Sequence, residues 1–149
     1  EKTTEGGLDL CNPMVFEKVY QCVSTIREKI PDTKISFFTE ANVEVLEKAA
    51  QLKPEAIEIH TGSFAIAYNE GERLPSLQEK YISTFKNAKS YLDNMNIATH
   101  AGHGLTEESL KILIKENIFE EFNIGHWVIS EAVFKGLGKV VSDLREILH

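Results

Sequence analysis

The sequence predicts an α/β protein in which short parallel strands alternate with helices. Two observations support this prediction. Four short apolar runs each end in a polar or glycine-containing tip, which is how buried parallel strands deliver polar groups to the open end of an α/β fold. Between these runs, apolar residues recur at helical spacing over longer segments. Strand and helix alternate four times, which favours a parallel sheet with helical crossovers.

The four predicted strands end in motifs that suit an active-site rim. The first two runs cover 34–40 and 56–62, and the last two end in Ala101-Gly102-His103-Gly104 and Asn123-Ile124-Gly125-His126. Each of the last two motifs contains a Gly-His pair. Because parallel strands end at the same edge of a sheet, the strand ends are expected on one rim, at Glu40, Thr61, His103 and His126.

The second run alternates apolar and polar residues. The strand period of two therefore places Glu58 and His60 on one face and Ile57 and Ile59 on the other. In a barrel, one face looks inward and the other meets helices. An inward carboxylate is costly without a partner, so Glu58 either pairs with a cation or takes part in chemistry, and His60 is the candidate partner. Glu40, beside a polar loop, is expected to be solvated.

The segments between the strands carry helix start and stop signals. Asn12-Pro13 is an N-cap followed by proline at the first helical position, and this helix is expected to end by Pro31. Asn42 is expected to cap the next helix. Further helices are predicted from Pro75 to about Met95, after Thr106, and as two stretches beyond His126 that are separated near 136–138.

The chain length gives a second indication of architecture. One hundred and forty-nine residues suit one domain, but a closed eight-stranded barrel needs roughly 200 to 250 residues. Four strand–helix units therefore predict about half of a (β/α)8 TIM barrel. Residues 1–149 are expected to be the C-terminal part of a single barrel domain whose N-terminal half is absent from this sequence. A small self-contained α/β domain is the alternative.

The composition excludes some classes of protein. With 42% hydrophobic residues the chain can bury a sizeable core, and no apolar run is long enough to span a bilayer. The net charge of −7 argues against a general nucleic-acid surface, although a helix N-terminus can still hold a single phosphate. Cys11 and Cys22 have no CxxC spacing, which favours free thiols in a reducing cytoplasm.

Two residue groups are candidates for chemistry. His103 stands between glycines that permit close approach of a ligand, and its imidazole suits proton transfer near neutral pH. A turn histidine that caps the next helix is the alternative. Gly125-His126 opens a helix, so the amides of Gly125, His126 and Trp127 are placed to hold an anion. A plain strand-to-helix turn would look similar. The Trp127 side chain is expected in the core.

Five motifs follow one another along the chain at a characteristic spacing. They are TTEGGLD at 3–9, ISFFTE at 35–40, IEIHTG at 57–62, AGHGLT at 101–106, and NIGH at 123–126 followed by AVFKGL at 132–137. Together they resemble the pyridoxine 5'-phosphate synthase family of the bacterial deoxyxylulose-dependent vitamin B6 pathway. The resemblance extends over the whole chain. It implies a TIM barrel of which this sequence provides strands five to eight, with the TTEGG loop after strand four.

The resemblance also implies a reaction. Members of this family condense 3-amino-2-oxopropyl phosphate with 1-deoxy-D-xylulose 5-phosphate, which closes the pyridine ring of pyridoxine 5'-phosphate and releases inorganic phosphate and water. The family needs no metal and no organic cofactor, so none is expected here. A homo-oligomer is expected by the same resemblance, and neither nucleic acid nor membrane is an expected partner.

Site residues can be carried over only where the motifs match. The family's proton-donor histidine corresponds to His103, and its transition-state-stabilising glutamate corresponds to Glu58. The threonine that binds deoxyxylulose phosphate corresponds to Thr3, or to Thr4 if the loop is shifted by one residue. The positions that hold the amino-oxopropyl phosphate correspond to Gly104, Gly125 and His126.

The match is incomplete in two respects. The family's two proton acceptors, a histidine and a glutamate, lie on the first half of the barrel, together with an asparagine, an Asp-His pair and arginines, and none of these is in the 149 residues. Three places beside the motifs also depart from the family pattern. Thr39-Glu40 stands where Ile-Asp is common, Thr99-His100 where a small or amide residue precedes AGHG, and Glu131 where a basic residue is frequent.

Two other functions fit the same residues. Histidines and a carboxylate at strand ends could bind a divalent metal, as in TIM-barrel sugar isomerases or metal-dependent hydrolases; the residues are Glu58, His60, His100, His103 and His126. The glycines around His103 and the NIGH anion motif favour the metal-free reaction. A non-catalytic half-barrel that binds phosphate is the third alternative, and it predicts binding without turnover.

Overall fold

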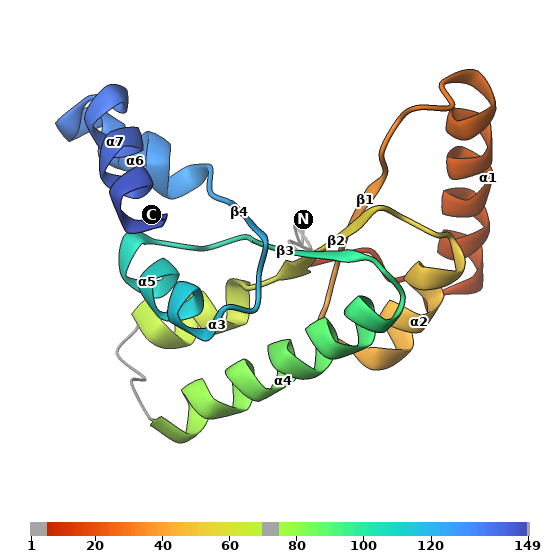
Figure 1. Cartoon of the computed structure of the whole chain (residues 1–149), viewed down its shortest axis with the longest axis horizontal. Coiled ribbons are helices and arrows are strands. Elements are labelled where there is room, and N and C mark those ends of the chain that lie inside the picture. Colours follow the sequence, from red (N-terminus) through yellow and green to blue (C-terminus); the bar gives the residue numbers. More distant parts are fainter. Residues whose placement is uncertain (1–5, 70–74, 149) are drawn as a thin grey trace.

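The computed structural model describes residues 6–69 and 75–148. Its centre is a four-stranded parallel sheet in the order β1-β2-β3-β4 (Figure 1). Neighbouring strands are consecutive in the sequence and parallel, which confirms the predicted α/β class. This is the strand order of four successive units of a (β/α)8 barrel. The strands are β1 (Ser36–Thr39), β2 (Ala56–His60), β3 (Ala98–Gly102) and β4 (Glu121–Asn123).

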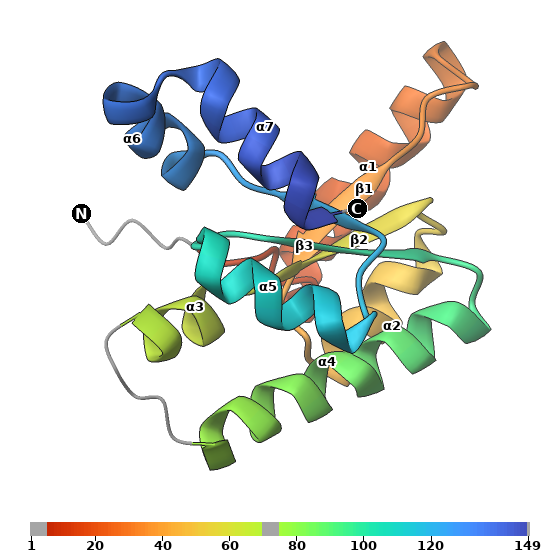
Figure 2. The same cartoon turned by 60° about the vertical axis from the view of Figure 1, so that its left-hand side comes forward.

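The helices connect the strands and cover mainly one side of the sheet. Figures 1 and 2 show α2, α4 and α5 along one face, whereas α1 and the α6–α7 pair stand at opposite ends of the sheet. The strand tips expected on one rim all follow the C-terminal ends of parallel strands, so that prediction is confirmed. The helices are α1 (Pro13–Lys29), α2 (Val43–Gln51), α3 (Gly62–Asn69), α4 (Pro75–Asn94), α5 (Glu107–Glu116), α6 (His126–Lys135) and α7 (Leu137–Leu148).

The predicted N-caps are present. The Asn12 side chain accepts a hydrogen bond from the Met14 N–H at 3.0 Å, and proline follows at the start of α1, where its missing N–H costs nothing. Asn42 caps α2 in the same way, accepting from the Glu44 N–H at 2.9 Å. Thr106 begins α5 with a capping box. Side-chain oxygens thus fix where three of the connecting helices begin.

Helix α3 was not predicted from the sequence. Its eight residues, GSFAIAYN, are almost all apolar or small, so they show no polar face from which a helical period could be recognised. The helix begins directly after Thr61, at the tip of β2. Phe64 and Ala65 are each only 1% exposed, whereas Ile66 is 56% exposed, so one side of the helix packs inward against α4 and α5 and the other faces solvent.

The alternation in β2 separates two chemically different faces. Ile57 and Ile59 are fully buried against the helix side, where Leu46 and Leu92 belong to the same core. Glu58 and His60 point to the opposite face and are half-buried. The prediction from the strand period is therefore confirmed. It follows that the ionisable groups of the sheet lie on the face that α2, α4 and α5 do not cover.

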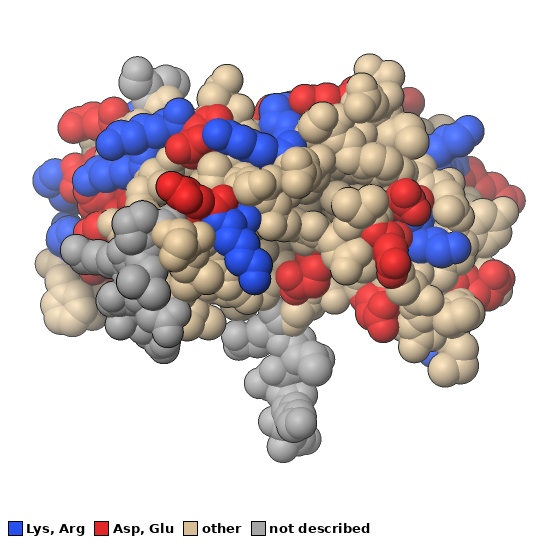
Figure 3. Space-filling view, turned by 90° about the horizontal axis from the view of Figure 1, so that it is seen from below, with Lys and Arg blue, Asp and Glu red and all other residues tan. Residues whose placement is uncertain are grey.

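The surface carries charges of both signs. On the face seen in Figure 3, described Lys and Arg side chains alternate with Asp and Glu, and no broad basic patch forms there. Ion pairs among the described residues include Lys86 with Glu116 at 2.6 Å and Lys89 with Asp93 at 2.8 Å. Within residues 6–69 and 75–148, no helix is long and apolar enough to cross a membrane.

Among residues 6–69 and 75–148, two buried hydroxyl groups of the core lack a hydrogen-bond partner. Thr39 and Thr99 are both 0% exposed, and neither Oγ1 has a partner. Thr61 is equally buried, but its hydroxyl lies 2.8 Å from the Gly102 carbonyl oxygen. A buried hydroxyl without a partner costs free energy, whereas a methyl group of the same shape does not. Two of the positions that depart from the family pattern thus place an unsatisfied polar atom in the core.

We expect Thr39→Val to raise the free energy of unfolding by about 1 kcal/mol, because it replaces an unsatisfied buried hydroxyl by a methyl group. Thr99→Val should act in the same direction. Thr61→Val is the matched control and should lower stability, since its hydroxyl has partners. Urea unfolding of the whole protein measures all three. A Thr39→Val variant less stable than the parent would show that the Thr39 hydroxyl is hydrogen-bonded in solution.

Candidate active site

Two rows of residues cross the sheet on its polar face. The strand register aligns Phe38, Glu58, His100 and Glu121 in one row. The next row toward the strand ends aligns His60, Gly102 and Asn123. Because the strands are parallel and in register, ionisable side chains from three strands come together at the rim. The sequence pattern alone could not give this register.

The Glu58 side chain leaves its own row and crosses β3 above Gly102. A Cβ atom built on Gly102 would lie 1.8 Å from Glu58 Oε1, so the carboxylate occupies the place of the missing side chain. On the far side, the Asn123 Nδ2 donates a hydrogen bond of 2.9 Å to Glu58 Oε2. The carboxylate thus spans the glycine strand and is held from β4. Because Gly102 has no side chain, it leaves room for the side chain of Glu58.

Opposing influences act on the charge of Glu58. Burial raises the pKa of the Glu58 carboxyl above its ordinary value, while the hydrogen bond from Asn123 and the nearby His100 and His103 lower it. Glu121 opposes these and raises it further. The net direction is upward. The protonated form is therefore favoured more than for a solvent-exposed glutamate, and loss of the Asn123 hydrogen bond would increase that preference.

His60 is not the partner of Glu58, which corrects the expectation from the sequence. Its Nδ1 lies 3.0 Å from Glu40 Oε1, although the angles are not those of a hydrogen bond, and both ring nitrogens are buried. Glu40 is half-exposed, as expected for a solvated group, but it is also within ion-pair distance of His60. Glu58 reaches across β3 to Asn123 on β4, whereas His60 lies against Glu40, just after β1. The pattern of alternation along β2 could not reveal this difference.

His103 occupies an unusual backbone position. Its backbone φ angle is +78°, in the left-handed region that residues other than glycine rarely adopt. Gly104 follows with a φ of +74°. The Thr61 hydroxyl lies 2.8 Å from the Gly102 carbonyl oxygen and 2.9 Å from that of His103, and so fastens this turn to the tip of β2. Strained residues held by their surroundings are frequent at functional sites.

Aromatic rings fix the direction of the His103 side chain. Its ring centroid is 4.8 Å from that of His60 and 6.4 Å from that of Phe38. His60 in turn meets Phe38 edge to face at 5.3 Å. These three rings come from β1, β2 and the turn after β3. His103 is thereby held beside the sheet face instead of projecting freely from its loop.

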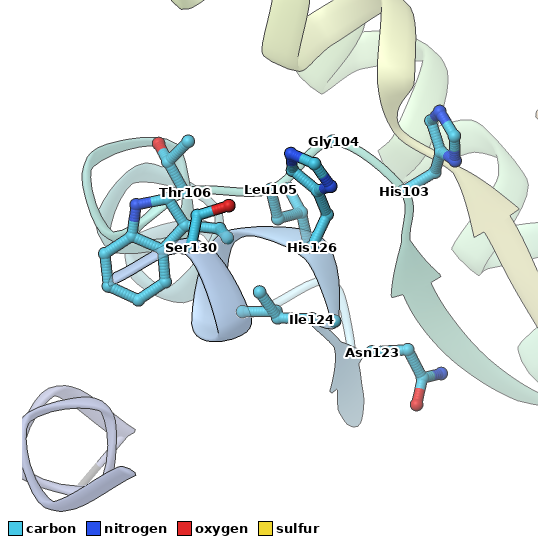
Figure 4. Close-up of a pocket in the computed structure, with 10 residues that line it drawn as sticks. His103, Gly104, Leu105, Thr106, Asn123, Ile124, His126 and Ser130 are labelled. Atoms are coloured by element: carbon cyan, nitrogen blue, oxygen red, sulfur yellow. The ribbon is translucent and has the colours of Figure 1, made fainter. Parts of the chain in front are cut away.

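The two Gly-His motifs line one cavity of about 720 Å³. Figure 4 shows His103 and Asn123 at the ends of β3 and β4, with their side chains directed away from His126 and Ser130 of α6 in this view. Its full lining consists of His103, Gly104, Leu105, Thr106, Asn123, Ile124, Gly125, His126, Trp127 and Ser130. The cavity thus brings together four of the residues predicted from the sequence to act on or bind substrate.

The start of α6 forms one wall of this cavity. Gly125 is its N-cap and makes no side-chain hydrogen bond, so the first amides of the helix are left for another acceptor. No atom lies within 4 Å of a Cβ placed on Gly125, which means that the wall is open there. Trp127 was expected in the core, but its side chain is half-buried and lines the cavity. No residue of α6 is fully buried, so this helix does not pack into the core.

Thr3 and its alternative Thr4 lie outside the described residues. His100 is in register with Glu58, and its Nδ1 is 3.7 Å from Glu121 Oε1. Glu131 pairs with Lys135 at 2.6 Å along α6. Within the described ranges, no group of three or more His, Cys, Asp or Glu side chains could hold a metal ion, so the metal-dependent alternative gains no support from these side chains.

Asn123 and Thr61 are the site residues that sequence reasoning missed. Both stand inside motifs, NIGH and IEIHTG, whose recognisable signals are the histidine and the glycine; the sequence placed Thr61 only at a strand end. Their roles depend on contacts across strands, with Glu58 and with the turn at His103. The sequence signal is their position at a strand end: Asn123 is the last residue of β4, and Thr61 directly follows β2.

Comparison with known proteins identifies relatives of the whole chain. The family model described as "Pyridoxal phosphate biosynthesis protein PdxJ" matches residues 1–149. The chain is 36% identical over 149 residues to the pyridoxine 5'-phosphate synthase of Wolbachia sp. subsp. Drosophila simulans, with 97% of this chain and 57% of that protein covered. It is 33% identical over 150 residues to the synthase of Aquifex aeolicus, with 99% and 60% covered.

A third relative agrees with these two. The pyridoxine 5'-phosphate synthase of a Sulfurihydrogenibium species is 34% identical over 148 residues, with 99% of this chain and 57% of that protein covered. The chain therefore spans about three-fifths of the length of the curated relatives it matches. Its similarity to them extends over nearly all of its own length.

Gly102→Ala should lower the free energy of unfolding by about 1 to 3 kcal/mol, because the added methyl group overlaps the Glu58 carboxylate. Most of this loss should disappear in a Glu58→Ala background, where the overlapping atoms are gone. Gly138→Ala is a control, because nothing lies within 4 Å of its Cβ position. Denaturant unfolding of the four variants compares them. An equal cost of Gly102→Ala in both backgrounds would place the Glu58 carboxylate elsewhere.

Proposed function

The chain belongs to the family of the pyridoxal phosphate biosynthesis protein PdxJ, and from this membership we propose that it forms the second half of the (β/α)8 barrel of a pyridoxine 5'-phosphate synthase. The proposed reaction condenses 3-amino-2-oxopropyl phosphate with 1-deoxy-D-xylulose 5-phosphate to give pyridoxine 5'-phosphate, inorganic phosphate and water. Residues 1–149 would be the C-terminal part of one barrel domain. The other strands of the barrel would correspond to the part of the relatives' length that this chain does not span.

One observation carries this proposal beyond the similarity of sequences. The two Gly-His motifs, which are about twenty residues apart in the chain, line one cavity at the carboxyl edge of the sheet. Active sites of (β/α)8 barrels lie at this edge, and phosphate groups are commonly bound after the last strands at a helix N-terminus. A proton-transfer group and an anion-binding wall therefore share the space that a phosphorylated substrate would need.

The residues take distinct roles in this proposal. Gly104, Gly125 and His126 hold the amino-oxopropyl phosphate, with the open wall at Gly125 supporting the approach of a phosphate to backbone amides. Thr3 binds deoxyxylulose phosphate, as the family resemblance implies. The nearby half-buried Glu58 stabilises a positively charged or hydrogen-bonding intermediate, and Asn123 keeps its carboxylate in place.

Ring formation gives His103 its task. Closing the pyridine ring requires the loss of water and of phosphate, and each departing oxygen needs a proton. An imidazole held beside the cavity can donate that proton and be recharged, because this side chain can act both as a general acid and as a general base. The strained turn fastened by Thr61 and the contact with the His60 ring support such a role, since they fix the ring at the cavity wall.

Further expectations accompany the proposed activity. The reaction needs no metal and no organic cofactor, and the family's proton acceptors would come from the other half of the barrel. We place the protein in the cytoplasm, which the two free, exposed cysteines Cys11 and Cys22 support. We also propose a homo-oligomer, as the family resemblance implies.

Replacing Gly125 by valine tests the anion site. The side chain would enter the open wall of the cavity, and loss of one charge-assisted hydrogen bond costs roughly tenfold or more in binding. We expect Gly125→Val to raise the KM for amino-oxopropyl phosphate about tenfold or more and to change the KM for deoxyxylulose phosphate far less. Gly138→Val, in an equally open position on α7, is the control. Equal effects on both substrates would assign the phosphate to the wrong place.

His103→Asn tests the proton transfer in the whole protein, including any part of the polypeptide beyond these residues. We expect kcat to fall by about 100- to 10,000-fold, the usual contribution of a positioned acid or base, with little change in either KM. His126→Asn provides the comparison, because it should act mainly on the KM for amino-oxopropyl phosphate. Near parental turnover of His103→Asn with both substrates saturating would reduce this histidine to a loop residue. Glu58→Gln, which keeps the shape of the side chain, should lower kcat comparably if its charge is what matters.

A further inference from the structure

Asn123 contacts two parts of the site at once. It is a lining residue of the cavity formed by the Gly-His motifs, and its side-chain amide donates to Glu58 Oε2 at 2.9 Å. We propose that Asn123 is a positioning residue that holds the Glu58 carboxylate above Gly102 by a hydrogen bond, so that it acts on turnover through Glu58. This inference rests on the proposed function of Glu58 in ring formation.

The geometry of the sheet makes this contact specific. Glu58 is on β2 and Asn123 on β4, two strand spacings or about 10 Å apart. Neither side chain spans that distance alone. They meet because Gly102 on the strand between them is in register with Asn123 and has no side chain in the way. A side chain at position 102 would separate the pair, and a shift of β4 by one residue would turn Asn123 to the other face.

The chemistry of the two groups fixes the direction of the hydrogen bond. An ionised carboxylate only accepts, so the asparagine must present its NH₂ group to Glu58. Beside its second N–H, the amide then presents a carbonyl oxygen, which repels a phosphate. Asn123 is therefore better suited to hold Glu58 than to bind the substrate phosphate, even though it lines the same cavity.

The other charged groups around Glu58 do not replace Asn123. His100 faces Glu58 from β3, Glu121 from β4, and His103 from the turn after β3. The histidines favour the ionised carboxylate and Glu121 disfavours it, while burial raises the Glu58 pKa. The Asn123 hydrogen bond is the largest influence in the opposite direction, and it has no charge that changes with pH.

Asn123→Leu tests this role, because leucine has a similar size and no donor. We expect kcat at neutral pH to fall roughly 10- to 100-fold, the effect of losing one hydrogen bond to a charged group, with both KM values changed less than about threefold. The pKa of Glu58 should rise, so the acidic limb of the kcat profile should move to higher pH and kcat should recover as the pH is raised. Asn94→Leu is the matched control: Asn94 is also exposed and donates at 2.9 Å, but to the Ser90 carbonyl oxygen of α4.

A double-mutant cycle separates action through Glu58 from direct contact with substrate. In a Glu58→Gln background, Asn123→Leu should lower kcat less than about threefold further, because the carboxylate it serves is gone. Multiplicative losses would overturn the inference and assign Asn123 to substrate binding. If Glu58→Gln retained full turnover, the proposed role of Glu58 in the reaction would be wrong.

A titration measures the same contact without turnover. The ¹³C resonance of the Glu58 carboxyl group, assigned by its absence in Glu58→Gln, should titrate at higher pH in Asn123→Leu than in the parent protein. Asn94→Leu should leave it unchanged. An unchanged Glu58 titration in Asn123→Leu would overturn the inference, whatever the outcome for the catalytic role of Glu58. Circular dichroism of each variant shows whether it retains the fold.

Discussion

The site depends on one carboxylate that crosses a strand of the sheet above a glycine. Glu58 reaches Asn123 only because β2, β3 and β4 are parallel, adjacent and in register, and because Gly102 leaves the space between them open. The cost of partly burying the charge is offset by one neutral donor and by two histidines. The register of three strands is thus expressed in the position and the protonation of a single group.

The core between the sheet and the helices fixes the register of β2 and β3 from the face opposite to Glu58. Ile57, Ile59 and Ala101 are fully buried on the face that meets the helices, so β2 and β3 cannot slide by one residue without moving these side chains out of the core. Thr61 ties the tip of β2 to the turn after β3 and so fixes His103 relative to Glu58. Packing on one face therefore determines the chemistry that the other face can perform.

Much of the fold followed from the sequence, because the signals were local. Strand alternation placed Glu58 on the polar face, and the Asn12 and Asn42 caps marked where helices begin. The sequence did not predict the short helix α3, because its apolar residues do not form a stripe along one face. In the site, the Gly-His motifs indicated the cavity, but the partner of Glu58 was assigned to His60, two residues away on the same strand, instead of Asn123, sixty-five residues away. Contacts between strands depend on register, which no local pattern contains.

In the proposed site, the residues that would perform the chemistry differ from those that hold them in place. His103 and Glu58 carry groups that can exchange protons or charge. His103 has a strained backbone conformation, and the Glu58 carboxylate is partly buried, which raises its pKa. Gly102, Thr61 and Asn123 have no such chemistry, yet each removes a freedom or an obstacle that would let those two groups move apart. A site of this kind can lose its function through a change in a neutral residue on a neighbouring strand. Its sequence requirements therefore extend to positions where the side chain is absent, as at Gly102.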